Sequence, residues 1–583
     1  MSWGGVIDLA IILLLSIPYL IYWNLIRNYQ TDTKGGITGT LLFLIPIVPA
    51  FVLNLIDLGY YRHSLRRSGI EVLSLIKPGL EFITGIIQLY WWLLFSGMLL
   101  LYFFGLLVYK YLTSPRFKNE QGLKTPVGWI TKVGVILILI AGLAGNKQLF
   151  VPTKPLIQIS PALLPAAQNS FGTFLYSWVK GDYNIKRPEW VDEGNTQTSS
   201  NFIKQYSFSD TFSKQNVVVI ILESFVAEVL REDDPKKAAT PFLDSLFKHC
   251  IIFNNTISNS FQSNQGIVSI MGSFPSPPQI PFFNSPYSTN KMKGIGYLLG
   301  DEGYSTFFAM GAEPDHFGFK RFMKMLGIQK YIDKDQYGNK NHEDGNWGVY
   351  DHYFLPFVAN QINEFDQPFL GVLYNLSSHP PFTLPSNWQG VSEKKQMPYQ
   401  DAISYVDFAL QLFFAQAKKS GWFDSTYFVF ISDHGIAYDD ESNKNWTSRV
   451  SIPFFIYHPK LTTYQPVSTL AQQWDMLPTL LDLLGYPKSF FSFGESVFRK
   501  KNPVVYNLMD NSLRIYKDEY LAEMNLEDRA IVGLYTYKTD SMLLNNLVRD
   551  TVYKQLLPTF RQLGTNWYQE WFQAMENDKM LVK

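Results

Sequence analysis

The fold of this chain is decided by two stretches, Val217-Val218-Val219-Ile220-Ile221-Leu222-Glu223-Ser224 and Tyr427-Phe428-Val429-Phe430-Ile431-Ser432-Asp433-His434-Gly435. Each is an uninterrupted run of β-branched, aliphatic and aromatic residues, which predicts a strand buried on both faces of a parallel sheet. In open α/β sheets, ligands bind beyond the carboxyl ends of the strands. Glu223, Asp433 and His434 are therefore placed where a divalent cation would be held.

Strands and helices are predicted to alternate from about residue 216 onward. Such alternation implies right-handed crossovers and an α/β fold, with a mostly parallel sheet sandwiched by helices. Beyond the two deciding strands, the predicted elements are helices at 240–249, 265–274 and 399–420, a helix ending at 361–365, and strands at 251–253 and 368–375.

Overall composition excludes several classes of protein. The 583 residues carry 50 basic and 50 acidic side chains, and this neutrality argues against a nucleic-acid partner. Cys250 is the only cysteine, which excludes a disulfide scaffold and a cysteine-rich metal site.

Four stretches of the N-terminal quarter carry almost no charge: residues 6–26, 37–56, 82–109 and 127–145. An apolar helix of roughly 20 residues spans a bilayer, so we expect about four spans in a transmembrane helical domain, 1–147. Buried helices of a soluble protein are the alternative, and they fit these lengths less well. Basic residues are equally frequent in two successive loops, so the charges do not set the orientation.

Three further divisions follow the membrane segment. Residues 148–215 are polar and rich in proline, which indicates a stalk or linker. We expect the catalytic domain at 216–500 and a C-terminal subdomain, 501–583, that packs on it.

The candidate site residues each have a plainer alternative. Ser263 precedes an apolar helical stretch, where it could be a nucleophile beside backbone N–H groups that favour phosphate or sulfate, or a simple N-cap. Asp433 and His434 could belong to a surface turn, and Glu223 could pair with an Arg or Lys. His379 could orient a substrate or protonate a leaving oxygen, or be a structural turn histidine. Trp347 could form a pocket wall or be part of the core.

These fragments, in their order along the chain, resemble the lipoteichoic acid synthase branch of the alkaline phosphatase/sulfatase superfamily, including its Bacteroidetes-type membrane members. The matching segments are Leu222-Glu223-Ser224, the loop 259–266 with the helix after it, 315–319, Gly345-Asn346-Trp347-Gly348, Ser378-His379-Pro380, Asp433-His434-Gly435 and 473–481.

The resemblance implies a fold, a metal and roles for particular residues. By this resemblance, Glu223, Ser263, Asp433 and His434 hold one Mn²⁺ or Mg²⁺, and Ser263 attacks a phosphoglycerol-type or sulfate ester to form a covalent intermediate. His379 binds substrate and assists the leaving group. The resemblance also implies a multi-pass protein of the bacterial inner (plasma) membrane, with an extracytoplasmic catalytic domain acting on a phospholipid or glycan of the envelope.

One departure from the family pattern keeps a second function open. The family's loop offers a threonine flanked by arginines, whereas here Ser263 replaces the threonine and Gln262 and Gln265 stand where basic residues are expected. Gln265, with Trp347 and His379, is then a candidate for substrate binding. An arginine clamp stabilises transferring phosphoryl charge, so its loss favours an alternative. That alternative is a catalytically degenerate protein that binds an anionic envelope ligand.

Overall fold

The structure is a computed structural model that describes residues 11–12, 15–22, 33–64, 80–112, 170–171, 174, 187–191, 202–206, 212–230, 239–277, 282, 285, 287–288, 290–314, 318–388, 398–436, 445–509, 512–578 and 580–582. The chain divides into two units, Met1–Asp182 and Tyr183–Lys583. The unit boundary falls inside the predicted stalk, and the finer domain boundaries stay predictions.

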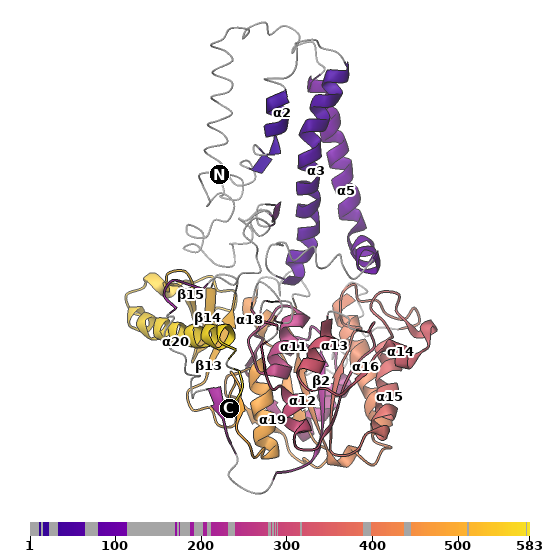
Figure 1. The fold of residues 1–583 in the computed structure, drawn as a ribbon, viewed down its shortest axis with the longest axis vertical. Helices are drawn as coiled ribbons and strands as arrows, with labels where there is room; N and C mark the ends of the chain where they lie inside the picture. The colour runs from indigo at the N-terminus through magenta and orange to yellow at the C-terminus, as the bar shows by residue number, and fades with distance from the viewer. Residues whose placement is uncertain are drawn as a thin grey trace. The chain divides into compact units, whose positions relative to one another are not determined.

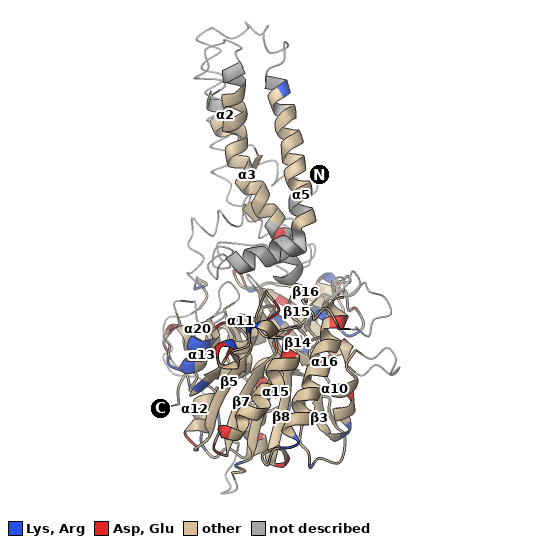
Figure 2. Ribbon diagram, turned by 90° about the vertical axis from the view of Figure 1, so that its right-hand side faces the viewer, with Lys and Arg blue, Asp and Glu red and all other residues tan. Residues whose placement is uncertain are grey.

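The described part of the first unit is helical, with α2 (Ile17–Ile21), α3 (Thr33–Ser64) and α5 (Leu80–Leu112) (Figure 1). Charged residues are sparse along α3 and α5 (Figure 2). Within α3, Ile37–Leu55 has a mean hydropathy of 2.0 and is long and apolar enough to cross a membrane, which suggests membrane anchoring. The described part of α5 holds a shorter apolar helix, Phe95–Leu107. The predicted span 127–145 and most of 6–26 lie outside the described residues, so the four-span topology stays a prediction.

The second unit is built around an eight-stranded sheet with the order β10-β3-β9-β8-β2-β7-β5-β6. Its strands are β2 (Asn216–Leu222), β3 (Cys250–Phe253), β5 (Ser305–Met310), β6 (Lys330–Ile332), β7 (Phe369–Tyr374), β8 (Thr426–Ser432), β9 (Phe454–Tyr457) and β10 (Gln465–Val467). The predicted strands are confirmed, and β9 alone among these eight runs antiparallel to its neighbours. The sheet is therefore mixed but mostly parallel, as expected for the α/β class.

Strand β2 lies at the centre of the sheet and is buried on both faces. Val217, Val219 and Ile221 belong to one hydrophobic core. Val218, Ile220 and Leu222 belong to the other. An apolar strand without alternation is stable here because helices cover both faces, and each side chain leaves water.

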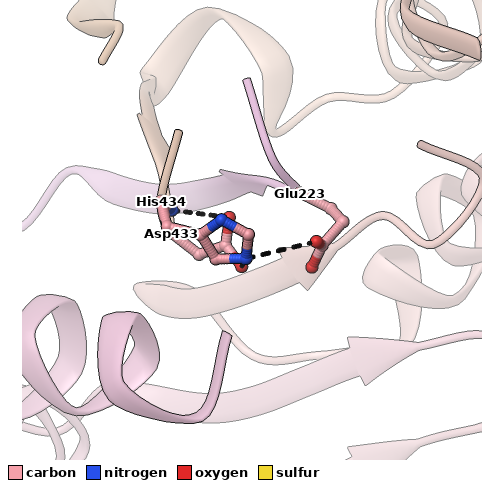
Figure 3. A group of neighbouring side chains, drawn as sticks. All are labelled: Glu223, Asp433 and His434. Atoms are coloured by element: carbon pink, nitrogen blue, oxygen red, sulfur yellow. Dashed lines mark hydrogen bonds and ion pairs between the residues drawn. The ribbon is translucent and has the colours of Figure 1, made fainter. Parts of the chain in front are cut away.

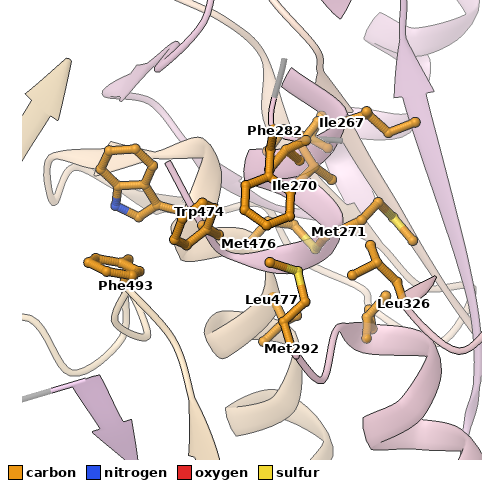
Figure 4. Packing of buried hydrophobic residues seen from close by; sticks show 14 of the residues in the cluster. Ile267, Ile270, Met271, Phe282, Met292, Leu326, Trp474, Met476, Leu477 and Phe493 are labelled. Atoms are coloured by element: carbon orange, nitrogen blue, oxygen red, sulfur yellow. The ribbon is translucent and has the colours of Figure 1, made fainter. Parts of the chain in front are cut away.

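Helices on the two faces come from distant parts of the chain. The first core is covered by α11 (Ser263–Gly272), α12 (Ile295–Gly300), α13 (Phe319–Met325) and α19 (Met476–Leu484). Figure 4 shows Ile267, Ile270 and Met271 of α11 beside Met476 and Leu477. The second core is covered by α10 (Pro241–Leu246), α15 (Asp351–Gln361) and α16 (Pro398–Ala417).

The predicted helices are present with shifted ends. The helix expected at 265–274 begins two residues earlier, at Ser263, and ends at Gly272. It ends there because Ser273 takes a left-handed conformation, with φ 49°, that breaks the helical hydrogen-bond pattern. The helix expected at 240–249 is α10 followed by a 3-10 turn, Phe247–His249.

The last part of the chain forms an antiparallel sheet of β13 (Val504–Leu508), β14 (Ser512–Lys517), β15 (Tyr520–Asn525) and β16 (Ile531–Tyr535). Helix α20 (Leu557–Glu576) follows it. The smaller elements are β1 (Ile203–Lys204) paired with β12 (Phe490–Phe491), β4 (Thr256–Ile257) paired with β11 (Ala471–Gln472), α14 (Lys334–Tyr337) and α18 (Trp446–Val450).

Candidate metal centre

Three predicted metal ligands meet at the carboxyl ends of β2 and β8. These strands are parallel neighbours with Leu222 opposite Ser432, so the residues that follow, Glu223 and Asp433, leave the sheet side by side. One ligand atom from each of Glu223, Asp433 and His434 lies within 4.8 Å of the other two (Figure 3). All three side chains are buried.

The Ser263 hydroxyl joins this cluster from the first turn of α11. Its Oγ donates to Glu223 Oε2 at 3.0 Å and lies 3.4 Å from His434 Nε2. The N-cap position belongs to Gln262, which makes no side-chain cap. The simple-cap alternative for Ser263 is therefore wrong, because its hydroxyl faces the carboxylate rather than the helix backbone.

Tyr374, which the sequence reasoning missed, lies between the two carboxylates. Its hydroxyl is 2.5 Å from Glu223 Oε2 and 2.6 Å from Asp433 Oδ2. A phenol has a single proton and can donate to only one of them at a time. The signal available in the sequence was a tyrosine, with its polar hydroxyl, at the end of an apolar run. In the structure this run is β7, and Tyr374 lies opposite Ile221 of β2.

The backbone around Glu223 is also held in place. The Glu223 N–H donates to Asn375 Oδ1 at 2.9 Å, and the Ser224 N–H donates to Asp433 Oδ1 at 2.8 Å. Ser224 has a left-handed φ of 63°, which turns the chain sharply after the strand. Among the described residues no Arg or Lys pairs with Glu223, so the ion-pair alternative is not found there.

Gln473 connects the loop 259–266, which carries Ser263, to the end of β8 through hydrogen bonds. Its Oε1 accepts from the Asn259 N–H at 2.8 Å and the Ser260 hydroxyl at 3.0 Å. Its Nε2 donates to the carbonyl oxygens of Ser432, at 2.9 Å, and Asp433. Gln473, the first residue of the segment 473–481, therefore holds this loop and the end of β8 together through hydrogen bonds.

Burial and crowded charge shift the pKa values of the cluster in opposite directions. Burial raises the pKa of Asp433, and the negative charge of Glu223 raises it further. For Glu223, burial opposes ionisation, but the charges of His379 and His434 outweigh it and lower the pKa. Burial opposes the charged form of His434, yet both carboxylates raise its pKa. Perturbed groups of this kind are typical of functional sites.

The donor set fits a hard divalent cation. Two carboxylates, an imidazole and a hydroxyl converge in one buried place, and within the described part of the chain no Arg or Lys pairs with the carboxylates of Glu223 and Asp433. Carboxylate and hydroxyl oxygens suit Mg²⁺ and Mn²⁺, and imidazole is a common additional ligand. The cluster could therefore bind a metal ion.

The structure also describes the other predicted site residues, His379, Trp347 and Gln265. His379 follows β7 and lies close enough for its charge to lower the pKa of Glu223. Its ring packs edge-on against Trp347, with centroids 4.3 Å apart, and the Trp347 indole donates to the Pro380 carbonyl at 2.8 Å. Trp347 is half-buried and packs against the first hydrophobic core, so its role as a pocket wall stays a prediction. Gln265 is buried in the first turn of α11, and residues 315–317 lie outside the described part of the chain.

Comparison with known families agrees with this geometry. Residues 215–486 match the sulfatase family. The matched segment makes up a little under half of the chain, and its mixed, mostly parallel sheet and its candidate metal site are alkaline phosphatase/sulfatase-like.

The chain is also distantly similar to lipoteichoic acid synthases. It is 26% identical to the lipoteichoic acid synthase-like protein YvgJ of Bacillus subtilis over 369 residues, 56% of this chain and 58% of that protein. It is 25% identical to the lipoteichoic acid synthase of Staphylococcus aureus over 365 residues, 56% of this chain and 55% of that protein. The chain thus spans little more than half the length of these relatives.

Two solved structures share the fold. An alkaline phosphatase superfamily protein from Vibrio parahaemolyticus has a TM-score of 0.56 at 19% identity, covering 75% of this chain and 100% of that one. The lipoteichoic acid synthase LtaP from Listeria monocytogenes has a TM-score of 0.52 at 20% identity, covering 65% of this chain and 97% of that one.

Proposed function

We propose that this protein is a membrane-anchored, metal-dependent transferase of phosphoglycerol-type groups, or a hydrolase of sulfuric or phosphoric esters, that works through a covalent intermediate on Ser263. One observation carries the proposal. The Ser263 hydroxyl donates a hydrogen bond to Glu223 of the buried Glu223–Asp433–His434 cluster. A hydroxyl that could act as the nucleophile therefore lies beside two carboxylates and an imidazole that could bind a metal ion.

In this proposal Ser263 Oγ attacks the phosphorus or sulfur atom of the ester. A bond from Oγ to that atom forms while the bond to the ester oxygen breaks, and the hydroxyl proton passes toward Glu223 Oε2, which already accepts it at 3.0 Å. His379 binds the substrate and gives a proton to the leaving oxygen. Water or an acceptor hydroxyl then releases the group from Ser263, giving hydrolysis or transfer.

Glu223, Ser263, Asp433 and His434 would hold one Mn²⁺ or Mg²⁺. When bound, such an ion lowers the pKa of a serine hydroxyl and neutralises charge on the transferring group. Trp347, which packs on His379, would form the wall of the substrate site, and Gln265 in the first turn of α11 would donate to substrate oxygens.

The substrate and its location follow from the relatives and the membrane segment. The names of the similar proteins support an envelope lipid or glycan as substrate. We propose a multi-pass protein of the bacterial plasma membrane with the second unit outside the cytoplasm. The apolar helix Ile37–Leu55 supports the anchoring part of this proposal.

The test uses the full chain in detergent with Mn²⁺ and two kinds of ester, a glycerol phosphodiester and an aryl sulfate. Turnover of either should fall at least 100-fold in Ser263→Ala and stay unchanged in the exposed control Ser245→Ala. Mass spectrometry of the trapped protein should place the group on the Ser263 peptide. Unchanged turnover in Ser263→Ala would contradict the proposal. No turnover of any ester, together with tight binding of an anionic glycan, would support the degenerate binding protein.

A further inference from the structure

The C-terminal sheet carries a row of polar side chains on the face turned away from α20. Antiparallel register places Asn507 of β13 opposite Arg514 of β14, and Arg514 opposite Glu523 of β15. Directly opposed residues share one face of a sheet. The other face belongs to α20, since a Cβ at Gly564 would lie 2.8 Å from Ile515 Cδ1 and Met524 Sδ.

This polar row contacts the loop that carries Ser263. Asn507 Nδ2 donates to the Ser258 carbonyl at 2.9 Å, and on the neighbouring residue of β13 the Tyr506 carbonyl accepts from Asn259 Nδ2 at 2.7 Å. Two hydrogen bonds thus fix the start of the loop against the C-terminal sheet.

Arg514 reaches the same loop through two aromatic rings. Its guanidinium carbon lies 3.7 Å from the centre of the Trp446 ring, a cation–π contact. The Trp446 ring lies 5.5 Å from the ring of Phe261, two residues before Ser263. Both rings are half-buried, so the contact borders solvent while the guanidinium beneath it is only 3% exposed.

The hydrogen-bonding capacity of this row is not used up within the described part of the chain. Arg514 Nε and Nη1 are buried without a hydrogen-bond partner there, and so are Asn507 Oδ1 and the Tyr535 hydroxyl. Glu523 Oε2 forms an ion pair with Arg514, but at 3.7 Å from Nε it is too far away to accept a hydrogen bond. A buried donor without an acceptor lowers stability, and more so when it is charged, so an oxyanion is a fitting additional partner for these groups.

The loop 258–266, which carries Ser263, has no positively charged side chain. Residues 258–266 read Ser-Asn-Ser-Phe-Gln-Ser-Asn-Gln-Gly, without Arg or Lys. A guanidinium is weakly hydrated and offers a rigid fork of donors that matches the oxygens of phosphate or sulfate. Arg514 of β14 therefore places a positive charge beside the loop 258–266, which contains no Arg or Lys.

We propose that Arg514 and Trp446 form a subsite for a second oxyanion of the substrate, a phosphate or sulfate next to the ester that Ser263 attacks. The Arg514 Nε–H and Nη1–H groups, which lack a hydrogen-bond acceptor, bind the oxyanion. The half-buried Trp446 and Phe261 rings pack against the apolar carbons that join the two groups. This inference rests on the proposed function for the identity of the ester, and it makes the preferred substrate a molecule with at least two anionic groups.

The test measures binding rather than turnover. Isothermal titration calorimetry uses the full chain with Mn²⁺ and Ser263→Ala, so that no probe is consumed. The probes are a glycerol phosphate dimer against glycerol phosphate, and a disulfated disaccharide against its monosulfated form. With Arg514 present, the two-anion probe of at least one pair should bind at least tenfold more tightly than its one-anion partner.

Adding Arg514→Met should remove that advantage and change affinity for the one-anion probe less than twofold. Arg514→Lys keeps the buried charge but not the planar set of guanidinium donors, so it should lose part of the affinity advantage of the two-anion probe. The matched control Lys517→Met, on the same strand but paired with Asp518, should keep it. If the glycerol phosphate pair shows the preference, the second oxyanion of the substrate is a phosphate; if the sulfated disaccharide pair shows it, the oxyanion is a sulfate.

Three results would overturn the subsite. They are no preference for two anions in either pair, the same preference in Arg514→Met, and an equal loss for both probes of a pair, which would mean that Arg514 only supports the loop. Should Arg514→Met fail to fold, judged by its melting temperature, Arg514→Lys and Trp446→Leu decide the matter in the same assay. An Arg514-dependent preference in a protein without turnover would leave the subsite standing and refute the proposed catalysis.

Discussion

The backbone carbonyl oxygen of Asp433 lies 2.1 Å from the position that a Cβ atom would occupy at Gly266. Real Cβ atoms essentially never approach another heavy atom within 3.0 Å, so only glycine allows this contact. It brings the first turn of α11 against the end of β8. Ser263, three residues earlier in that turn, can therefore reach Glu223 and His434.

Gly266→Ala should separate α11 from β8. The added methyl group meets backbone that cannot rotate away, and overpacking of this kind costs about 1–3 kcal/mol of unfolding free energy. The melting temperature of the full chain should fall, and Ser263-dependent turnover should fall with it. Gly300→Ala is the matched control, because nothing lies within 4 Å of its Cβ position in α12. Equal melting temperatures for the two variants would contradict this role of Gly266.

Glu223→Gln should abolish stabilisation by a divalent cation. The amide keeps the shape of the side chain but removes a negative charge from the cluster. A ligand at about 100 times its dissociation constant stabilises a folded protein by about 2.7 kcal/mol, so Mn²⁺ should clearly raise the melting temperature of the unmodified protein. The control Glu364→Gln, at an exposed position, should respond to Mn²⁺ like the unmodified protein. An equal rise in Glu223→Gln would show that the ion binds elsewhere.

Gln473→Leu should destabilise the loop 259–266 that carries Ser263. Leucine fills similar space but leaves the Asn259 N–H and the Ser260 hydroxyl without their acceptor, and the Asp433 carbonyl without a donor. Unpaired buried groups cost roughly 1–3 kcal/mol each, and we expect a net loss of about 2–4 kcal/mol in unfolding free energy. Denaturant unfolding of this variant, beside Gln411→Leu at an exposed position, measures the difference. A loss of less than about 0.5 kcal/mol in unfolding free energy would contradict the stabilising role of the Gln473 hydrogen bonds.

Asp351 should make stability depend on pH. Its carboxylate accepts from the Ser377 and Leu376 N–H groups, in the turn that leads to His379, and burial raises its pKa to about 6. A raised pKa stabilises the fold below the unfolded value of about 4, and this contribution is lost as the pH rises through about 6. It amounts to about 3 kcal/mol at most.

Asp351→Asn has no proton to lose at this position. Its melting temperature should therefore rise relative to that of the unmodified protein between about pH 4 and pH 7. Thermal unfolding at several pH values in that range tests this sign, and parallel curves for the two proteins would show that Asp351 stays ionised in the fold.

Much of the second unit could be predicted because its strands are buried on both faces. The runs at 217–222 and 427–431 are apolar throughout, and a parallel sheet covered by helices is the place where such strands are stable. The residues that end these runs, Glu223, Asp433 and His434, could be chosen because carboxylates and histidines rarely follow a buried strand without a partner. The switch of β9 to the antiparallel direction carried no local signal, since strand direction depends on the path of the connecting chain.

The sequence by itself determined the class of fold, the ligand types at two strand ends and the apolar stretch that could cross a membrane, because hydrophobic periodicity and residue chemistry are local properties. Only the tertiary structure decided that Tyr374 lies between the two carboxylates, that the Ser263 hydroxyl faces Glu223 instead of capping its helix, and that Arg514 stacks on Trp446 beside Phe261. These contacts join residues 40 to 151 positions apart, and strand register and helix docking, rather than any local pattern, bring them together.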